Sequence, residues 1–140
     1  MEDVNPSFRR NVYWLGYLGL LPLAVSAILL WLNMLQPFAA LAVKGYAAVI
    51  LTFVGAIHWG RGLDRVDGQL LTISILPSLY AWICILLPIE TAIPLLILGF
   101  ILIFAFDYQQ YKKELGWFLK MRFFLTLSIS FILLASWYAL

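Results

Sequence analysis

Four ionisable side chains near the ends of apolar segments are the residues of this sequence best suited to chemistry: His58, Arg61, Asp107 and Arg122. Asp107 is expected at the C-terminal end of one helix and Arg122 at the start of the next, so each charge is opposed by its own helix dipole. A charge at the membrane edge is costly unless it is paired. We therefore predict a structural ion pair between Asp107 and Arg122 that bridges the last two helices.

The same side chains, together with Trp59, form a candidate ligand pocket. His58 is the only histidine, and histidine changes charge near neutral pH, so it could handle a proton or contact a ligand. The alternative is a structural histidine at a helix end, bonded to Asp107 or to a carbonyl. Trp59 could stack on a ring or a quaternary headgroup, or simply lie at the headgroup level like other membrane tryptophans. The predicted ligand-binding residues are His58, Trp59, Arg61, Asp107 and Arg122, and the candidate ligands are a lipid headgroup, a quinone or another anionic molecule.

Motifs for catalysis and for metal or cofactor binding are not recognisable in the sequence. It contains no G-x-S-x-G, no H-E-x-x-H and no phosphate-binding G-x-x-x-x-G-K-[ST] motif. One histidine and one cysteine, Cys84, do not build a metal centre within the chain, and a single cysteine cannot form an intramolecular disulfide. We expect no catalytic residue, no metal and no cofactor.

Helices that cross a membrane must position these side chains. The chain of 140 residues is 64% hydrophobic and only 11% charged, whereas soluble domains carry about a quarter charged residues. Its apolar runs match a bilayer core of about 30 Å at a rise of about 1.5 Å per residue. We predict an all-α integral membrane protein, a single domain whose five-helix transmembrane bundle covers residues 12–32, 38–58, 69–89, 91–107 and 122–140. The segment 108–121 is polar but aromatic in part, and we expect an interfacial helix there.

The distribution of basic residues predicts the orientation of this bundle. Of the nine Lys and Arg residues, all but Lys44 lie before the first run or on alternate connections. Short loops rich in Lys and Arg stay in the cytoplasm, so we predict a cytoplasmic N-terminus and a C-terminus outside. The net charge of +2 then indicates attraction to anionic membrane lipids, with no indication of nucleic-acid binding.

Small residues recur at every fourth position of the second predicted helix. They are Ala48, Thr52, Ala56 and Gly60. Residues four apart lie on neighbouring positions of a helix surface, and small side chains let membrane helices approach closely. We predict that this is a helix-packing face.

Several stretches together resemble a known family. They are L-G-Y-L-G-L-L-P up to Pro22, F-V-G-A-I-H-W-G at 53–60, a helix ending in Asp107, and G-W-F-L-K-M-R-F-F-L-T at 116–126. Over nearly its whole length the chain resembles the domain-of-unknown-function 3429 family, and the G-[GA]-I-H-W-G element is the most specific part. In the resembling proteins the position of Phe118 is usually tyrosine. The resemblance implies a multi-pass protein of a bacterial inner membrane, or of a mitochondrial membrane in a eukaryote, and it implies no activity, cofactor or catalytic residue.

Three classes of function follow, in descending order of support. The first is a non-catalytic module that associates with itself or with a larger membrane complex, favoured by the small-residue face and by the missing catalytic motifs. The second is binding or transport of a lipid, quinone or other small amphiphile or ion through the cytoplasm-facing pocket of His58, Trp59, Arg61, Asp107 and Arg122. The third is an enzyme acting on a lipid or quinone with His58 as the base.

Overall fold

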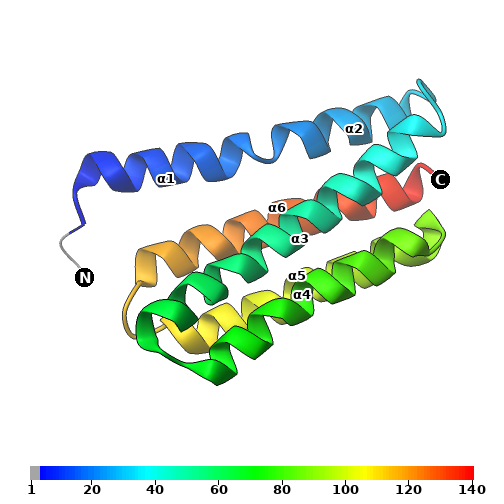
Figure 1. Ribbon diagram of the computed structural model, residues 1–140. Coiled ribbons are helices and arrows are strands. Elements are labelled where there is room, and N and C mark those ends of the chain that lie inside the picture. Colours follow the sequence, from blue (N-terminus) through cyan, green and yellow to red (C-terminus); the bar gives the residue numbers. More distant parts are fainter. Residues whose placement is uncertain (1–3) are drawn as a thin grey trace.

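The computed structural model describes residues 4–140 and consists of helices joined by short connections (Figure 1). Five helical stretches are long and apolar enough to cross a membrane, and α1 and α2 together form the first of them. The helices are α1 (Pro6–Leu18), α2 (Leu21–Trp31), α3 (Phe38–Arg65), α4 (Gly68–Leu86), α5 (Ile89–Tyr111) and α6 (Gly116–Tyr138). The prediction of an all-α protein with five helices able to span a membrane is confirmed, and its orientation stays a prediction.

The first span starts earlier than expected and is interrupted. Asn5 caps α1 by accepting a hydrogen bond from the backbone N–H of Ser7, and Pro6 occupies the first turn. The helix ends at Leu18 and restarts as α2 because Pro22 has no N–H to donate and its ring crowds the carbonyl four residues earlier. The first span is therefore two short helices that can differ in direction.

The second span extends beyond its expected end at residue 58. Helix α3 continues to Arg65 and ends where Val66 adopts a left-handed conformation with φ of 54°. The backbone N–H of Asp67 then donates to the carbonyl of Gly62 at 2.9 Å, as in common helix ends. The side chain of Asp67 also caps α4. His58 and Arg61 thus lie within α3 and not at its end.

The side of α3 that packs inside the bundle is not the predicted small-residue face. Ala48 is buried and Thr52 is half-buried, but Ala56 and Gly60 are exposed. Four residues turn a helix of 3.6 residues per turn by about 400°, so a stripe with this spacing rotates by about 40° at each step. The stripe therefore leaves the core before the helix ends. The buried positions in this part of α3 are Leu51, Val54, Gly55, His58 and Gly62.

Glycines allow close contact between α3 and α4. A Cβ placed on Gly55 would lie 2.8 Å from the Cβ and Cγ atoms of Pro77, and one on Gly62 would lie 2.8 Å from Leu71 Cδ2. Pro77 lies inside α4. Its ring therefore occupies the space that Gly55 leaves free.

Residues 108–121 do not form a separate interfacial helix. Helix α5 continues through Tyr111, four residues connect it to α6, and α6 already begins at Gly116. The reason is burial: Tyr111 and Met121 are 2% and 4% exposed, so the helix turns on both sides of the connection belong to the packed bundle. Whether the connection lies at the membrane surface stays a prediction.

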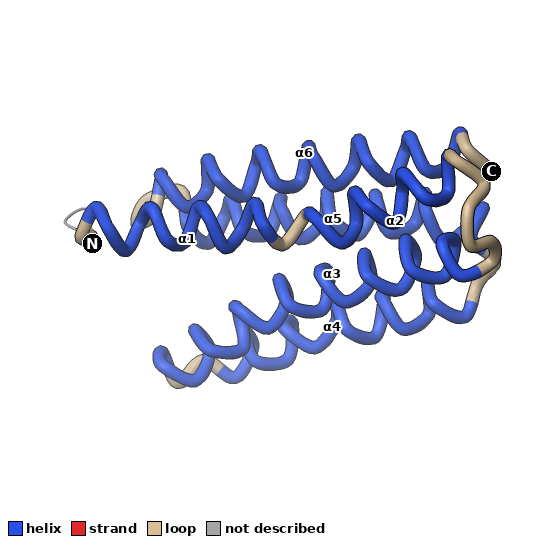
Figure 2. The backbone as a smooth tube through the Cα atoms, turned by 90° about the horizontal axis from the view of Figure 1, so that it is seen from above, coloured by secondary structure: helices blue, strands red, loops and turns tan. Residues whose placement is uncertain are grey.

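The helices run up and down, so the predicted basic segments meet at one end of the bundle. The start of α1, the α3–α4 connection and the α5–α6 connection lie together, opposite the C-terminus (Figure 1); we call this the charged end. At the other end Lys44 Nζ donates to the carbonyls of Ile85 and Leu87 at 2.8 Å each, and so caps the last turn of α4. Helix α2 lies beside α3, whereas α1 diverges from α3 towards the N-terminus in both views (Figures 1 and 2).

Candidate functional site

A buried polar cluster joins three helices near the charged end. The carboxylate of Asp107 accepts a hydrogen bond from His58 Nε2 at Oδ1, 2.6 Å away, and another from Arg122 Nε at Oδ2, 2.8 Å away. The three residues are 2%, 0% and 3% exposed, respectively. The structure therefore brings Asp107 and Arg122 together as the predicted ion pair, and it adds His58 as a second partner of the same carboxylate.

Helix geometry explains why these side chains meet. His58 follows Leu51, Val54 and Gly55 on the inward side of α3, at the three- and four-residue spacing of one helix face. Asp107 lies one turn before the end of α5, and Arg122 lies in the second turn of α6, so both stand at the same depth across the short connection. Charge-assisted hydrogen bonds to one carboxylate then hold α3, α5 and α6 together.

Aromatic side chains enclose the cluster on the side of the charged end. The ring of His58 meets Phe106 edge-on at 4.8 Å between centroids and lies 5.8 Å from the ring of Tyr111. Tyr111 in turn contacts Phe118 edge-on at 5.2 Å. These rings keep the charges of the cluster in an apolar surrounding, where an unpaired charge is costly.

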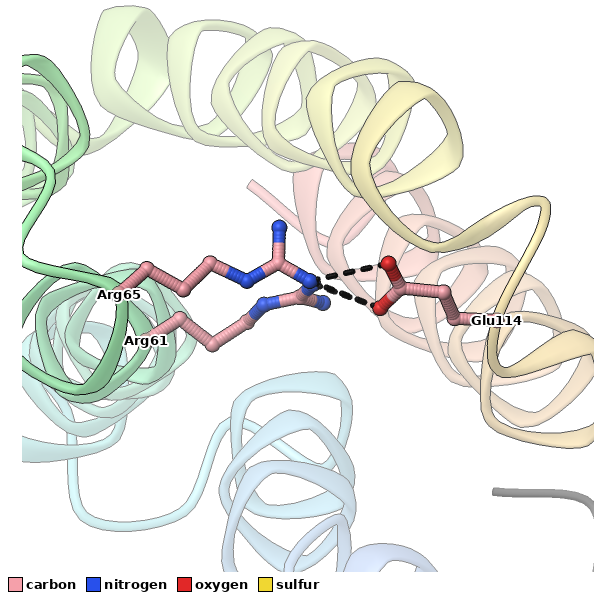
Figure 3. A network of polar contacts seen from close by, with 3 residues as sticks. All are labelled: Arg61, Arg65 and Glu114. Carbon is pink, nitrogen blue, oxygen red and sulfur yellow. Dashed lines mark hydrogen bonds and ion pairs between the residues drawn. The ribbon is translucent and has the colours of Figure 1, made fainter.

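Arg61 takes part in a different cluster, which includes Arg65 and Glu114. Arg61 Nη2 donates to Glu114 Oε2 at 3.0 Å, and Arg65 Nη2 donates to both carboxylate oxygens at 3.0 and 2.8 Å (Figure 3). The guanidinium of Arg61 also lies 4.2 Å from the centroid of the Tyr111 ring, a cation–π contact. This Glu114 cluster ties the end of α3 to the α5–α6 connection. Arg61 is therefore separate from Asp107, contrary to the expected convergence of all four ionisable groups.

Hydrogen bonding from Arg65, together with the charges of Arg65 and Arg61, lowers the pKa of Glu114 below its ordinary value of 4.5. A lowered pKa means that the ion pair stabilises the fold above about pH 4.5 and that this contribution is lost as the pH falls through the lower, folded-state value. We expect Glu114→Gln to lower the melting temperature slightly at pH 7, and to matter less at about pH 3, because the stability from the ion pair is lost as the pH falls below 4.5 towards the lower, folded-state pKa. Thermal melts of both proteins in detergent at the two pH values measure this, and an equal difference at both would contradict it.

Trp59 is not part of either cluster. It is 43% exposed, and successive residues of a helix point about 100° apart, so the indole lies away from the buried His58 ring. Its predicted role in stacking on a ligand ring or a quaternary headgroup stays a prediction.

A groove lies between the first span and helices α3 and α6. Its volume is about 530 Å³, and we call it the α1–α6 groove. Among residues 4–140, Arg122 is the only charged residue that lines it. The described lining residues are Val12, Leu15, Gly16, Gly19, Leu20, Tyr46, Val49, Ile50, Phe53, Val54, Ile57, Phe118, Met121, Arg122, Leu125 and Ile129. The groove exists because α1 diverges from α3 (Figures 1 and 2) and buries none of its own residues.

Several buried polar atoms around the cluster have no hydrogen-bond partner. Among residues 4–140, Arg122 Nη2, His58 Nδ1 and the hydroxyl of Tyr111 are buried without a hydrogen-bond partner. Buried polar groups are nearly always paired, so each such atom calls for an explanation. Arg122 is distinctive because it also lines the groove.

Residues 8–138 match the family described as protein of unknown function (DUF3429). The chain belongs to this family. It is also similar to a protein of Xenopus tropicalis called transmembrane protein 69, with 30% identity over 135 residues that cover 91% of this chain. The match covers 53% of that protein, so this DUF3429 chain spans about half the length of the curated relative it matches. No solved structure matches the chain.

His58 lies in the F-V-G-A-I-H-W-G stretch of this DUF3429 chain, and its side chain is fully buried in the cluster. In the described part of the chain, residues 4–140, no three His, Cys, Asp or Glu side chains gather in a way that could hold a metal ion. The family match and the five helices long enough to cross a membrane make the protein a multi-pass membrane protein of the DUF3429 family.

Four neighbours of the two clusters were missed at the level of sequence: Phe106, Tyr111, Glu114 and Phe118. Tyr111 follows Asp107 by four residues, and Phe118 precedes Arg122 by four, so helical spacing could have placed both aromatic rings beside the ion pair. Glu114 is the one acidic residue between Asp107 and the end of the basic segment at Arg122. Its position among lysines was the available signal for a pairing role.

Proposed function

We propose that this protein is a non-catalytic membrane module that binds a small amphiphile in the α1–α6 groove. The observation that carries the proposal is the environment of Arg122, a buried arginine. Its Nε donates a hydrogen bond to Asp107, while its Nη2 has no hydrogen-bond partner. The same residue lines a groove whose other described lining residues are uncharged. A ligand with an apolar body and a polar head matches such a lining. Both oxygens of Asp107 already accept hydrogen bonds, which favours binding over acid–base chemistry at this carboxylate.

The volume and the lining of the groove are those of a small-molecule binding site. Small-molecule sites commonly measure about 300–1,000 Å³ and are lined mostly by apolar side chains. One side of the groove is formed by α1, which buries none of its own residues. Two hydrogen bonds connect it to the bundle: Tyr13 Oη donates to the carbonyl of Trp117 at 3.2 Å, and Tyr46 Oη donates to the carbonyl of Gly19, just after the helix, at 2.8 Å. Such a lightly held helix can admit an amphiphile from the membrane.

We infer the orientation of the module from its basic residues. The charged end carries eight of the nine Lys and Arg residues, and the positive-inside rule places it in the cytoplasm with the C-terminus outside. The groove and Arg122 then lie in the cytoplasmic half of the membrane. The family resemblance favours the inner membrane of a bacterium, or a mitochondrial membrane in a eukaryote.

A variant in which a larger side chain fills the groove tests the binding proposal. Leu125 lines the groove and Phe131 is 72% exposed on the same helix, so Leu125→Trp blocks the site and Phe131→Trp is the matched control. After purification in a gentle detergent, native mass spectrometry and solvent extraction are expected to find a bound amphiphile with the wild type and with Phe131→Trp, but not with Leu125→Trp. Equal ligand content in all three proteins would refute the assignment of the ligand to this groove.

A second candidate function is self-association through α3. Ala56 and Gly60 are exposed, and a Cβ added to Gly60 would meet no atom within 4 Å, so small residues face outward where a second copy could approach closely. The same native mass spectra report the oligomeric state. A monomer at all protein concentrations would count against this candidate and would leave the groove proposal unaffected.

A further inference from the structure

We propose that the head of the bound amphiphile is an uncharged hydrogen-bond acceptor, such as the carbonyl of an ester or a quinone, and not a carboxylate or phosphate. This inference rests on the proposed function, because it specifies the ligand of the same groove. It narrows the ligand class from any amphiphile to one whose head brings no charge.

The first step is the charge balance of the buried cluster. Asp107 contributes one negative charge, and Arg122 contributes one positive charge at 2.8 Å, so the cluster is neutral when His58 is neutral. His58 donates from Nε2 to Asp107, which a neutral imidazole can do. An anionic ligand head beside Arg122 would leave a net negative charge in an apolar groove, and burying an uncompensated charge is strongly unfavourable. An uncharged acceptor keeps the balance.

The second step is that, within residues 4–140, no second cation lines the groove to compensate an anion. Arg61 and Arg65 are held by Glu114, which lies beyond the aromatic rings at the charged end. Arg9 lies over the ring of Trp117 at 5.3 Å. Within residues 4–140, Arg122 is the one charged residue that lines the groove.

The third step is the number and position of the free donors. The hydroxyl of Tyr46, the other polar side chain of the lining, donates to the carbonyl of Gly19. The guanidinium of Arg122 is therefore the donor left for a ligand, and along α6 it lies between Phe118, nearer the charged end, and Ile129. Ile129 lines the groove seven residues further along α6, about 10 Å away at 1.5 Å per residue. The ligand thus has its acceptor beside Arg122 and an apolar tail directed along α6 towards the middle of the bundle.

Ligands with matched tails test the inference. Radiolabelled methyl myristate and myristate have the same acyl chain but a neutral or an anionic head, and decylubiquinone presents the other source of a neutral carbonyl. Binding to the full chain in nanodiscs, relative to empty nanodiscs, is measured at about pH 9, where the carboxyl of myristate is ionised. We expect the ester, the quinone or both to bind at least about tenfold more tightly than myristate, a difference of about 1.4 kcal/mol. Which of the two binds better identifies the source of the carbonyl.

A charge variant gives the inference a second, independent arm. Asp107→Asn removes the negative partner and leaves the charge of Arg122 uncompensated, so the affinity for myristate relative to that for the ester is expected to rise at least about tenfold. The comparison of ligands on the wild type stands even if this variant does not fold. Myristate binding as tightly as the ester, or tetradecane displacing the ester equally well, would overturn the inference and leave the groove as a binding site. Failure of every ligand to bind above empty nanodiscs would overturn the proposed function as well.

Discussion

Replacing Asp107 alone by leucine is expected to lower the free energy of unfolding by about 3–5 kcal/mol, the usual cost of leaving a buried charge without its partner. Arg122 and His58 are 3% and 0% exposed, and both donate to this carboxylate. Their hydrogen bonds cannot be replaced by water without opening the packed ends of α3, α5 and α6. Unfolding by sodium dodecyl sulfate in mixed micelles, followed by tryptophan fluorescence, measures the loss.

The double variant Asp107→Leu with Arg122→Met is the matched control. Replacing both charges by apolar residues of similar size removes the unpaired guanidinium, so the double variant is expected to be more stable than the single one. Glu114→Gln, which breaks a half-exposed ion pair, is expected to cost far less than Asp107→Leu. If the single and double variants unfold at the same detergent concentration, Asp107 and Arg122 are not coupled.

Substituting Gly55 by alanine is expected to destabilise the protein by about 1–3 kcal/mol, the range for forcing an extra methyl group into a packed interior. The added Cβ would lie 2.8 Å from two ring carbons of Pro77 and 3.3 Å from the carbonyl oxygen of Ser74. A proline ring inside a helix cannot rotate away, so α3 and α4 have to separate. The same detergent titration measures the effect.

Gly60→Ala is the matched control, one and a half turns away on the same helix. An added Cβ there meets no atom within 4 Å, so only the intrinsic preference of the backbone changes. Alanine favours helix over glycine by about 0.5–1 kcal/mol, and the variant is expected to be equally or slightly more stable. A comparable loss in both variants would show that Gly55 is not a contact point between α3 and α4.

The two structural predictions bear on the binding proposal. The Asp107 cluster fixes where Arg122 stands, and the contact of Gly55 with Pro77 fixes the rotation of α3, whose residues Val49, Phe53 and Ile57 line the opposite wall of the groove. Buried side chains therefore join α3 to α4, α5 and α6. Helix α1, by contrast, buries none of its own residues.

Local properties of the sequence determined the five spanning segments and the pairing of Asp107 with Arg122. Hydropathy over about twenty residues decides whether a helix can span a bilayer, and this requires no knowledge of neighbouring helices. The pairing could be predicted because each charge stands against its own helix dipole, at two helix ends joined by a short segment. The gathering of basic residues at one end follows from the alternation of direction along the chain.

Only the tertiary structure decided which faces of the helices meet. The spacing of Ala48, Thr52, Ala56 and Gly60 predicts one packing face. However, this row of residues rotates gradually around α3, and the position of α4 decides which of its members are buried. Likewise, Arg61 is near His58 in sequence but pairs with a carboxylate on another connection, Glu114. The groove depends on how far α1 diverges from α3. Helix rotation and divergence are determined by contacts between residues far apart in sequence, and no local pattern encodes them.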